Sequence, residues 1–384
     1  MKALFRRAWD AFLPIPNVDQ FEAFLTRAFL AAILHRFLPQ EAMDAVAQPK
    51  PVGLAHLMDL TWLSQPQPYA IFHFVFLVIA FLYASGIVLQ MTLPVLTLLH
   101  LLPYTLLNSQ ASPHHGYQII SLALVGMSVV AVAQGLSGKG QPWPSLKHLL
   151  ITVILAVVTT VLFDRFMMMR GAGETIAQWI GAMFGAQGPS YVFSLLRIVV
   201  FTLLAKALTE YAMKDEKRCL PSPLLNAYLL IAAQFMIGGA YLVSVCSKMQ
   251  MSKGQWLVNS HYVALDFVKT MRQSYYSALD PKFAQDPASV LFLMSHENLA
   301  RLFFGGGVLL ETVLILAVGT RWLALFFGIA LLVMHSTIEE LMTLTFPTNQ
   351  YMDTLFYINV PFLIALAVAK GDDRKALLTR HSIP

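Results

Sequence analysis

The chain contains a series of separate apolar runs, each about as long as a membrane-crossing helix, and these runs limit its possible folds more than any other feature. A helix needs ~20 consecutive, mostly apolar residues to span the hydrocarbon core of a bilayer. The runs lie at about 70–89, 91–107, 117–135, 147–164, 190–209, 223–245, 300–318, 321–338 and 352–369. A tenth run, at 21–38, contains charged residues, so we expect it either to contact protein or water or to lie in the membrane interface. The sequence therefore predicts an all-α protein, a polytopic helical membrane bundle of 9–10 transmembrane helices.

Composition agrees with a membrane protein. Of 384 residues, 57% are hydrophobic and 12% are charged, whereas a soluble protein usually has about 25% charged residues. No internal repeat or low-complexity segment is visible. We expect a single integral-membrane domain over 1–384, with an extracytoplasmic loop at about 246–298 and a short charged cytoplasmic tail at 370–384.

The distribution of Lys and Arg predicts the orientation. Basic residues are enriched in cytoplasmic connections, and placing both termini in the cytoplasm puts most of the basic connections there. The 108–116 connection, which has no Lys or Arg, then faces outward with the 246–298 loop. The composition fits a bacterial inner (cytoplasmic) membrane. The formal net charge of +5 is spread over loops and tails without a basic cluster among aromatics, so no nucleic-acid partner is expected.

Lys248 lies where an apolar run meets a polar segment, and it is the first candidate for chemistry. An ammonium at the edge of hydrocarbon is poorly solvated, which favours the uncharged amine. An uncharged lysine can act as a general base near neutral pH. The alternative is an anchor whose stem lies in lipid and whose charged end reaches the phosphates.

Two histidine-containing stretches are further candidates. His114 and His115 open the run at 117–135, and a helix N-terminus keeps an imidazole neutral and suited to bind an oxygen or accept a proton. The alternative is that both are merely interfacial. His335 and Glu339 lie four positions apart on one helical face and would form either a hydrogen-bonded pair or part of a metal site.

Neither a metal nor a thiol site is expected. No further ligand set accompanies His335 and Glu339, and Cys219 and Cys246 form no Cys-x-x-Cys motif. Glu311 lies within an apolar run and requires a partner, such as Arg301, Arg321 or a polar cavity.

These clusters, in this order, resemble the vitamin K-dependent γ-glutamyl carboxylase superfamily, whose bacterial members are called horizontally transferred transmembrane domain proteins. The run VCSKM at 245–249, followed by KGQW at 253–256, is similar to a family run of Gly-Val-Lys-Lys-Leu type. This match puts the family's catalytic lysine at Lys248 and Ser247 in place of the preceding lysine. HHGYQI at 114–119 resembles an Asn-His-Ser-Tyr-Leu motif and puts the active-site histidine at His115.

The resemblance extends from about residue 20 to 370 and also places Arg27, Glu311 and His335 at family positions. It implies catalytic roles for Lys248, His115 and His335. The residues that it implies for cofactor binding are His114, Tyr117, Tyr241, Trp256 and Glu311. The large propeptide-binding domain of the animal enzymes is expected to be absent.

The resemblance also implies a reaction. Lys248 would deprotonate a reduced quinone (menaquinol or vitamin K hydroquinone), O₂ would add, and the strong base so formed would take a C–H proton before CO₂ captures the carbanion. A dry cavity would protect that base from water. Besides the lipid bilayer, the implied partner is a peptide or small-molecule substrate at the extracytoplasmic face. A peptide would contact Lys269, Arg272, Tyr275 and Tyr276.

Other functions remain open on the sequence alone. The main alternative is a non-catalytic accessory membrane protein for maturation, export or immunity of a secreted peptide. A membrane-bound quinone oxidoreductase is a third possibility. A transporter is disfavoured because no inverted repeat is visible. A pocket enclosing Lys248, His115 and His335 would favour an enzyme.

Overall fold

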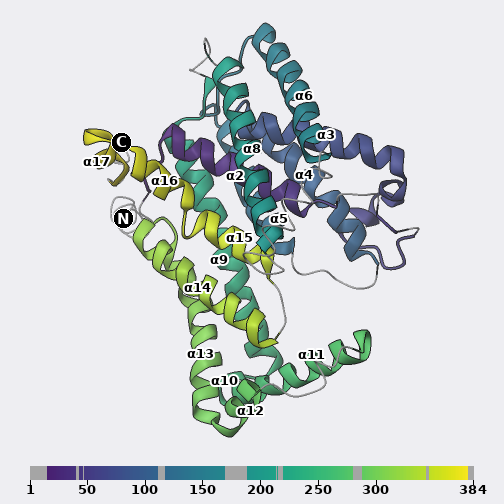
Figure 1. Cartoon of the computed structure of the whole chain (residues 1–384). Coiled ribbons are helices and arrows are strands. Elements are labelled where there is room, and N and C mark those ends of the chain that lie inside the picture. The colour runs from purple at the N-terminus through teal and green to yellow at the C-terminus, as the bar shows by residue number, and fades with distance from the viewer. Residues whose placement is uncertain are drawn as a thin grey trace. The chain divides into compact units, whose positions relative to one another are not determined.

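The described part of the chain is helical. The computed structural model describes residues 15–39, 43–45, 47–110, 117–168, 188–212, 214, 219–279, 288–342 and 346–378. Every helix or strand assigned within these ranges is an α-helix or a 3₁₀ helix, which confirms the all-α prediction (Figure 1). The described residues fall into two compact units: the first lies within 17–229 and 361–383, and the second comprises 15–16 and the described residues of 230–360. The expectation of a single domain over 1–384 stays a prediction.

The first unit packs long helices around aromatic side chains. Its elements are α2 (Gln20–Phe37), η1 (Gly53–His56), η2 (Thr61–Ser64), α3 (Pro66–Ala84), α4 (Leu89–Asn108), α5 (Gln118–Leu136), α6 (Leu146–Met168), α8 (Gly188–Ala212), the start of α9 (Pro223–Met251), most of α16 (Val360–Val368) and α17 (Gly371–Leu378). Phe81 of α3 stacks on Phe201 of α8 at 4.1 Å between ring centroids, and the edge of Phe163 from α6 packs against both rings.

The helix α2 shows how a charged run is accommodated. It begins after Asp19, whose side chain accepts a hydrogen bond from the backbone of Glu22 at 2.7 Å. Arg27 is buried, and its guanidinium donates to the carbonyl of Ala84 at 3.4 Å and to Asn226 Oδ1 at 3.2 Å. The predicted protein contact of this run is therefore present.

The connection between α2 and α3 lies outside the long apolar helices. Within it, Asp59 Oδ1 accepts a hydrogen bond from the backbone N–H of Thr61 at 2.9 Å, at the start of η2. This hydrogen bond, followed by one from the Thr61 side chain, lowers the pKa of Asp59.

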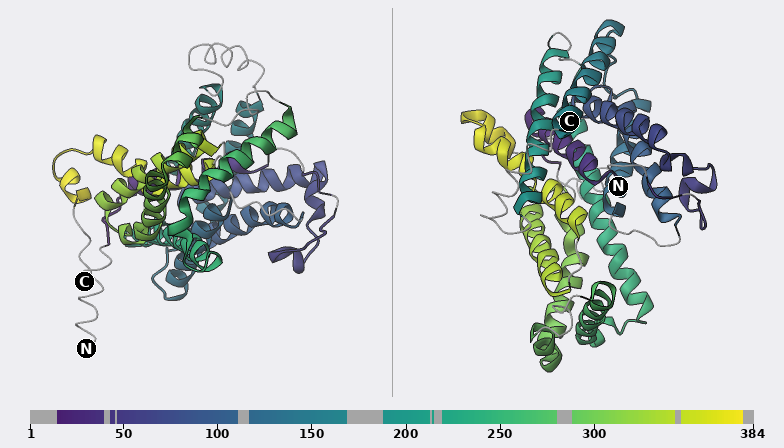
Figure 2. Two further views of the ribbon diagram at one scale, coloured as in Figure 1. Left: turned by 90° about the horizontal axis from the view of Figure 1, so that it is seen from below. Right: turned by 45° about the vertical axis from the view of Figure 1, so that its right-hand side comes forward.

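The second unit contains the candidate site. Its elements are the rest of α9, α10 (Trp256–Asn259), η5 (Ser260–Tyr262), α11 (Val263–Ala278), α12 (Ala288–Ser295), α13 (Glu297–Val313), η7 (Leu314–Ala317), α14 (Arg321–Met342) and α15 (Pro347–Phe356). The helices α10 and α12 lie at one end of α13, and α11 extends away from that end (Figure 1 and Figure 2). The predicted 246–298 loop is thus helical over most of its described length.

Eight described helical segments are long and apolar enough to cross a membrane. They are Pro66–Ala84, Leu89–Asn108, Gln118–Leu136, Leu146–Met167, Pro223–Met251, Glu297–Ala317, Arg321–Glu339 and Pro347–Val368. The other two predicted runs, at 21–38 and 190–209, coincide with α2 and α8. The prediction of an integral membrane protein with a helical bundle is confirmed.

The last of these segments is interrupted between α15 and α16, and Gln234 of α9 pairs with one buried backbone group there and one in the connection between η7 and α14. Its Nε2 donates to the carbonyl of Phe356 at 2.8 Å, and its Oε1 accepts from the N–H of Gly319 at 3.0 Å. Tyr357 Oη donates to the carbonyl of Gln234 at 2.7 Å. Irregular backbone at membrane depth requires such protein partners because lipid provides none.

We expect Gln234→Leu to destabilise the second unit strongly. The substitution leaves the carbonyl of Phe356 and the N–H of Gly319 without their side-chain partner, and each buried unpaired group costs about 1–3 kcal/mol. The midpoint of thermal unfolding of the detergent-solubilised protein measures the effect. Tyr357→Phe is the control, because it removes one hydrogen bond and leaves both of these backbone groups paired. An equal midpoint for both variants would contradict this role of Gln234.

Candidate functional site

The long helix α9 carries three polar side chains at intervals of seven residues: Gln234, Tyr241 and Lys248. Seven residues are almost two helical turns, so the three side chains lie along one face. Gln234 binds the backbone at the α15–α16 break, Tyr241 binds His335 and Asp353, and Lys248 binds Glu311. This polar face of α9 organises the site.

Lys248 and Glu311 form a close pair between α9 and α13. Lys248 Nζ donates to Glu311 Oε2 at 2.5 Å, and the side chains are 31% and 12% exposed. The ammonium position is also 5.8 Å from the centroid of the Trp256 ring. Of the partners expected for Glu311, Arg301 is engaged elsewhere: it binds Glu297 and the carbonyl of Val258. The partner of Glu311 is Lys248.

This pair borders a cavity of about 360 Å³. The rest of the lining is almost wholly apolar: Trp256, Val263, Phe303, Phe304, Gly306, Gly307, Val308, Leu310, Ala330, Val333, Met334, Thr337 and Ile338. The glycines keep one face of α13 bare, because a Cβ at Gly306 would meet nothing within 4 Å and one at Gly307 would lie 3.4 Å from Met334 Sδ. Apolar walls with a few converging polar groups are typical of ligand sites.

A more open depression of about 440 Å³ lies beside the cavity. Its lining includes Ser247, Met251 and Ser252, and it shares Lys248 and Trp256 with the cavity. The amine therefore stands between an apolar space and a surface depression.

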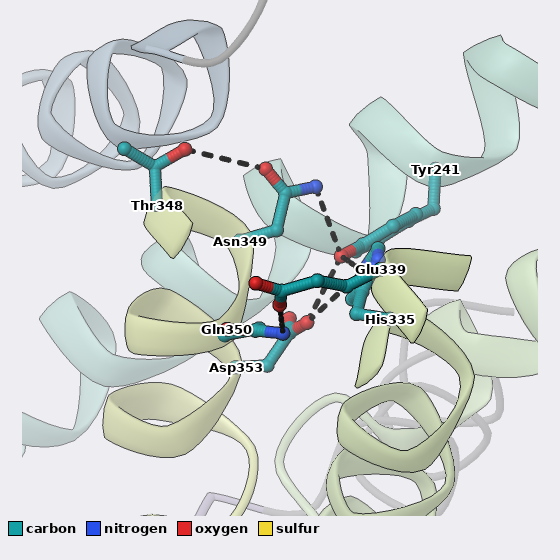
Figure 3. A network of polar contacts seen from close by, with 7 residues as sticks. All are labelled: Tyr241, His335, Glu339, Thr348, Asn349, Gln350 and Asp353. Carbon is teal, nitrogen blue, oxygen red and sulfur yellow. Dashed lines mark hydrogen bonds and ion pairs between the residues drawn. The ribbon is translucent and has the colours of Figure 1, made fainter. Parts of the chain in front are cut away.

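A second polar group lies buried where α9, α14 and α15 meet (Figure 3). Tyr241 Oη donates to Asp353 Oδ2 at 2.9 Å and lies 2.7 Å from His335 Nε2. Asn349 Nδ2 donates to the same hydroxyl at 3.3 Å. His335 Nε2 is 3.6 Å from Asp353 Oδ2, and the Asp353 side chain is completely buried.

The hydrogen bonds of this network show which of its polar atoms remain without a partner. Because Tyr241 donates to Asp353, its oxygen accepts from His335 and Asn349, so the His335 Nε2 carries the hydrogen. Within the described part of the chain, His335 Nδ1 and Asp353 Oδ1 have no hydrogen-bond partner. A neutral His335 thus retains one bare acceptor nitrogen in a dry environment.

The expected pairing of His335 with Glu339 is wrong. Glu339 Oε2 accepts from Gln350 Nε2 at 3.2 Å, while His335 turns toward Tyr241 (Figure 3). Among the described residues, no three His, Cys, Asp or Glu side chains are grouped as metal ligands.

The structure brings together some of the predicted site residues and separates others. Lys248, Trp256 and Glu311 line the cavity, whereas the described lining does not include Tyr241 or His335. The Lys248–Glu311 pair and the buried network of Tyr241 and His335 still lie within electrostatic reach of each other: Lys248 of His335, and Glu311 of Tyr241.

The remaining predicted residues belong to the first part of the chain. Tyr117 precedes α5 and packs against Tyr104 at 4.1 Å between ring centroids, within the first unit. His114 and His115 lie outside the described residues.

Asp353 and the bare face of α13 were not predicted. Asp353 is a single carboxyl group in an apolar run, and the rule that singled out Glu311 applies equally to it. The bare part of α13 had a sequence signal in Gly306 and Gly307, two of three consecutive glycines.

Comparisons of this chain with models of protein families, with curated proteins and with solved structures found no match.

We expect Tyr241→Phe to destabilise the fold by about 1–3 kcal/mol, because it leaves the buried carboxyl of Asp353 without its donor. Unfolding of the purified protein by denaturant in a fixed detergent measures the change. Tyr276→Phe serves as the matched control, since the Tyr276 side chain is 74% exposed. If both variants unfold at the same denaturant concentration, the network contributes no stability.

Proposed function

We propose that this protein is a membrane enzyme in which Lys248 accepts a proton from a reduced quinone held in the cavity beside α13. The proposal follows the resemblance to the vitamin K-dependent γ-carboxylase superfamily and takes O₂ and CO₂ as co-substrates. The substrate would be a peptide or small molecule at the extracytoplasmic face of a bacterial inner membrane. The observation that carries the proposal is an amine–carboxyl pair in the wall of an otherwise apolar, aromatic-lined cavity.

The cavity suits a flat apolar ring. Its volume of about 360 Å³ lies near the lower end of the ~300–1,000 Å³ range of small-molecule pockets. Trp256, Phe303 and Phe304 supply aromatic surfaces for stacking, and Gly306 leaves space beside them. A bicyclic ring would be held here with its hydroxyl toward Lys248 and its apolar tail toward lipid.

Glu311 has a direct part in this proposal. Lys248 cannot accept a proton while it is an ammonium, and Glu311 is the nearest group able to take the proton from it. The 2.5 Å contact between Nζ and Oε2 gives this proton a direct path to the carboxylate. Proton transfer from Nζ to Oε2 frees the amine, which then takes the proton of the ring hydroxyl.

The other lining residues exclude water and hold the ring. Val263, Val308 and Met334 line the cavity with apolar atoms, which disfavour water inside it. When bound, the reduced quinone would supply, together with O₂, the strong base that the resemblance implies. Tyr241 and His335 act from the adjacent buried group by holding α9 against α14 and α15.

One observation favours the accessory membrane protein instead. Lys248 already binds Glu311, and His335 already binds Tyr241. Each polar group thus has a structural explanation as a connection between helices, without chemistry.

Lys248→Met tests the catalytic role, because it keeps the apolar stem and removes the amine. Purified protein is incubated with reduced menaquinone and O₂, with and without CO₂, and quinone epoxide is measured by mass spectrometry. We expect epoxide from the wild type and a loss of at least a hundredfold in the variant. The control is Lys253→Asn, because the backbone of Lys253 is left-handed (φ 53°) and asparagine tolerates this conformation.

Equal epoxide formation by Lys248→Met would refute the proposed base. No epoxide from the wild-type protein, with quinone binding retained or not, would support the accessory protein. Circular dichroism and the unfolding midpoint establish that each variant is folded.

A second test asks whether menaquinone binds in the cavity beside α13. Gly306→Leu places a side chain in the cavity, and we expect it to weaken menaquinone binding at least tenfold, as measured by quenching of tryptophan fluorescence. Gly239→Leu is the matched control, since a Cβ at this helical glycine would also meet nothing within 4 Å, but Gly239 does not line the cavity. Unchanged affinity in Gly306→Leu would show that the ring does not bind here.

A further inference from the structure

The segment from α10 to α12 is tied to the membrane at both ends. The apolar helix Pro223–Met251 ends five residues before Trp256, and the apolar segment Glu297–Ala317 begins directly after α12. Both ends of the segment therefore lie at one membrane face. The first and last residues of the segment are thus within reach of the lipid headgroups.

This segment exposes nine large apolar or aromatic side chains. The exposed residues are Leu257, Val258, Tyr262, Leu265, Tyr276, Leu279, Leu291, Phe292 and Met294. The sequence of α12, ASVLFLMS, contains no charged residue. A water-facing surface seldom carries so many large apolar side chains, which mark an interaction surface.

The two faces of α11 differ sharply. Ala264 is buried with Val290 and Leu293 of α12 and with Ala300 and Phe304 of α13. The opposite face presents Tyr262, Leu265, Lys269 and Tyr276, spaced to lie on one side of a helix. Aromatic, aliphatic and lysine side chains on one face are typical of a helix lying in a membrane interface.

We infer that α10, α11 and α12 form a membrane-surface anchor whose exposed apolar face lies in the headgroup region of the bilayer that α9 and α13 cross. Leu265, Phe292 and Met294 enter the boundary with the acyl chains, and Lys269 reaches the lipid phosphates. The continuity of the anchor with two membrane-crossing segments favours lipid over a peptide. The uncharged sequence of α12 favours lipid as well.

The anchor also bears on the cavity. Trp256 and Val263 pack against the cluster that joins α11, α12 and α13, and both also line the cavity. Phe304 belongs to the cluster and to the cavity wall. The bilayer contact of α11 and α12 thus sets the position of one cavity wall. This inference does not depend on the proposed enzyme activity.

Spin labelling of the full chain in lipid nanodiscs tests the inference. In a background carrying Cys219→Ala and Cys246→Ser, single nitroxides are attached at Leu265→Cys and Phe292→Cys. Val243→Cys, exposed about two turns before the end of α9, is the lipid-facing control, and Asp372→Cys in α17 is the water-facing control. Power saturation compares collisions with O₂ and with a water-soluble nickel chelate.

We expect the labels at 265 and 292 to collide at least threefold more with O₂ than with the chelate, as at 243. Collision ratios like that at 372 would overturn the anchor. Water exposure that is lost only on addition of a peptide would also overturn it and would identify a peptide-docking surface.

Footprinting of the unmodified protein gives a second measurement that needs no variant. We expect hydroxyl radicals to modify Tyr276 and Met294 in nanodiscs at least fivefold less than Met58, which is exposed in the connection between α2 and α3. Equal modification of the three residues would contradict the inference.

Discussion

Hydrocarbon offers no hydrogen-bond partner, so the polar side chains that connect the apolar helices take their partners from other parts of the chain. Gln234 of α9 pairs with the carbonyl of Phe356 at the α15–α16 interruption and with the N–H of Gly319 before α14. Arg27 pairs in the first unit with the carbonyl of Ala84 and with Asn226. The polar side chains in the apolar helices are thus also the points at which distant parts of the chain are joined.

The same need for hydrogen-bond partners explains how the residues of the candidate site are paired. Tyr241 and Lys248 stand two turns apart on α9, and each recruits a carboxyl group from another helix. Asp353 is sealed beneath the surface, whereas Glu311 borders a cavity. Only the second carboxyl group therefore has access to a ligand, and chemistry is proposed at Lys248 and Glu311 rather than at the more deeply buried group. The buried group holds α9, α14 and α15 in place beside it.

The contact between Lys248 and Glu311 changes how Lys248 could act as a base. Lys248 does not stand alone at the edge of hydrocarbon, because its Nζ lies 2.5 Å from a carboxyl oxygen of Glu311. A base at this position depends on Glu311 as much as on desolvation. The glycines of α13 contribute space to this site, since larger side chains at Gly306 and Gly307 would fill part of the cavity.

The sequence by itself determined the membrane class, the positions of the helices and the location of Lys248 at a helix end, because length, apolarity and the end of an apolar run are local properties. It also identified Glu311 as a carboxyl group in need of a partner. The tertiary structure decided which partner that is, and it separated His335 from the cavity that Met334, the preceding residue, lines. Successive residues on a helix point about 100° apart. The rotation of each helix, which selects the facing residue, is set by packing against segments distant in the chain, and so no local pattern in the sequence contains it.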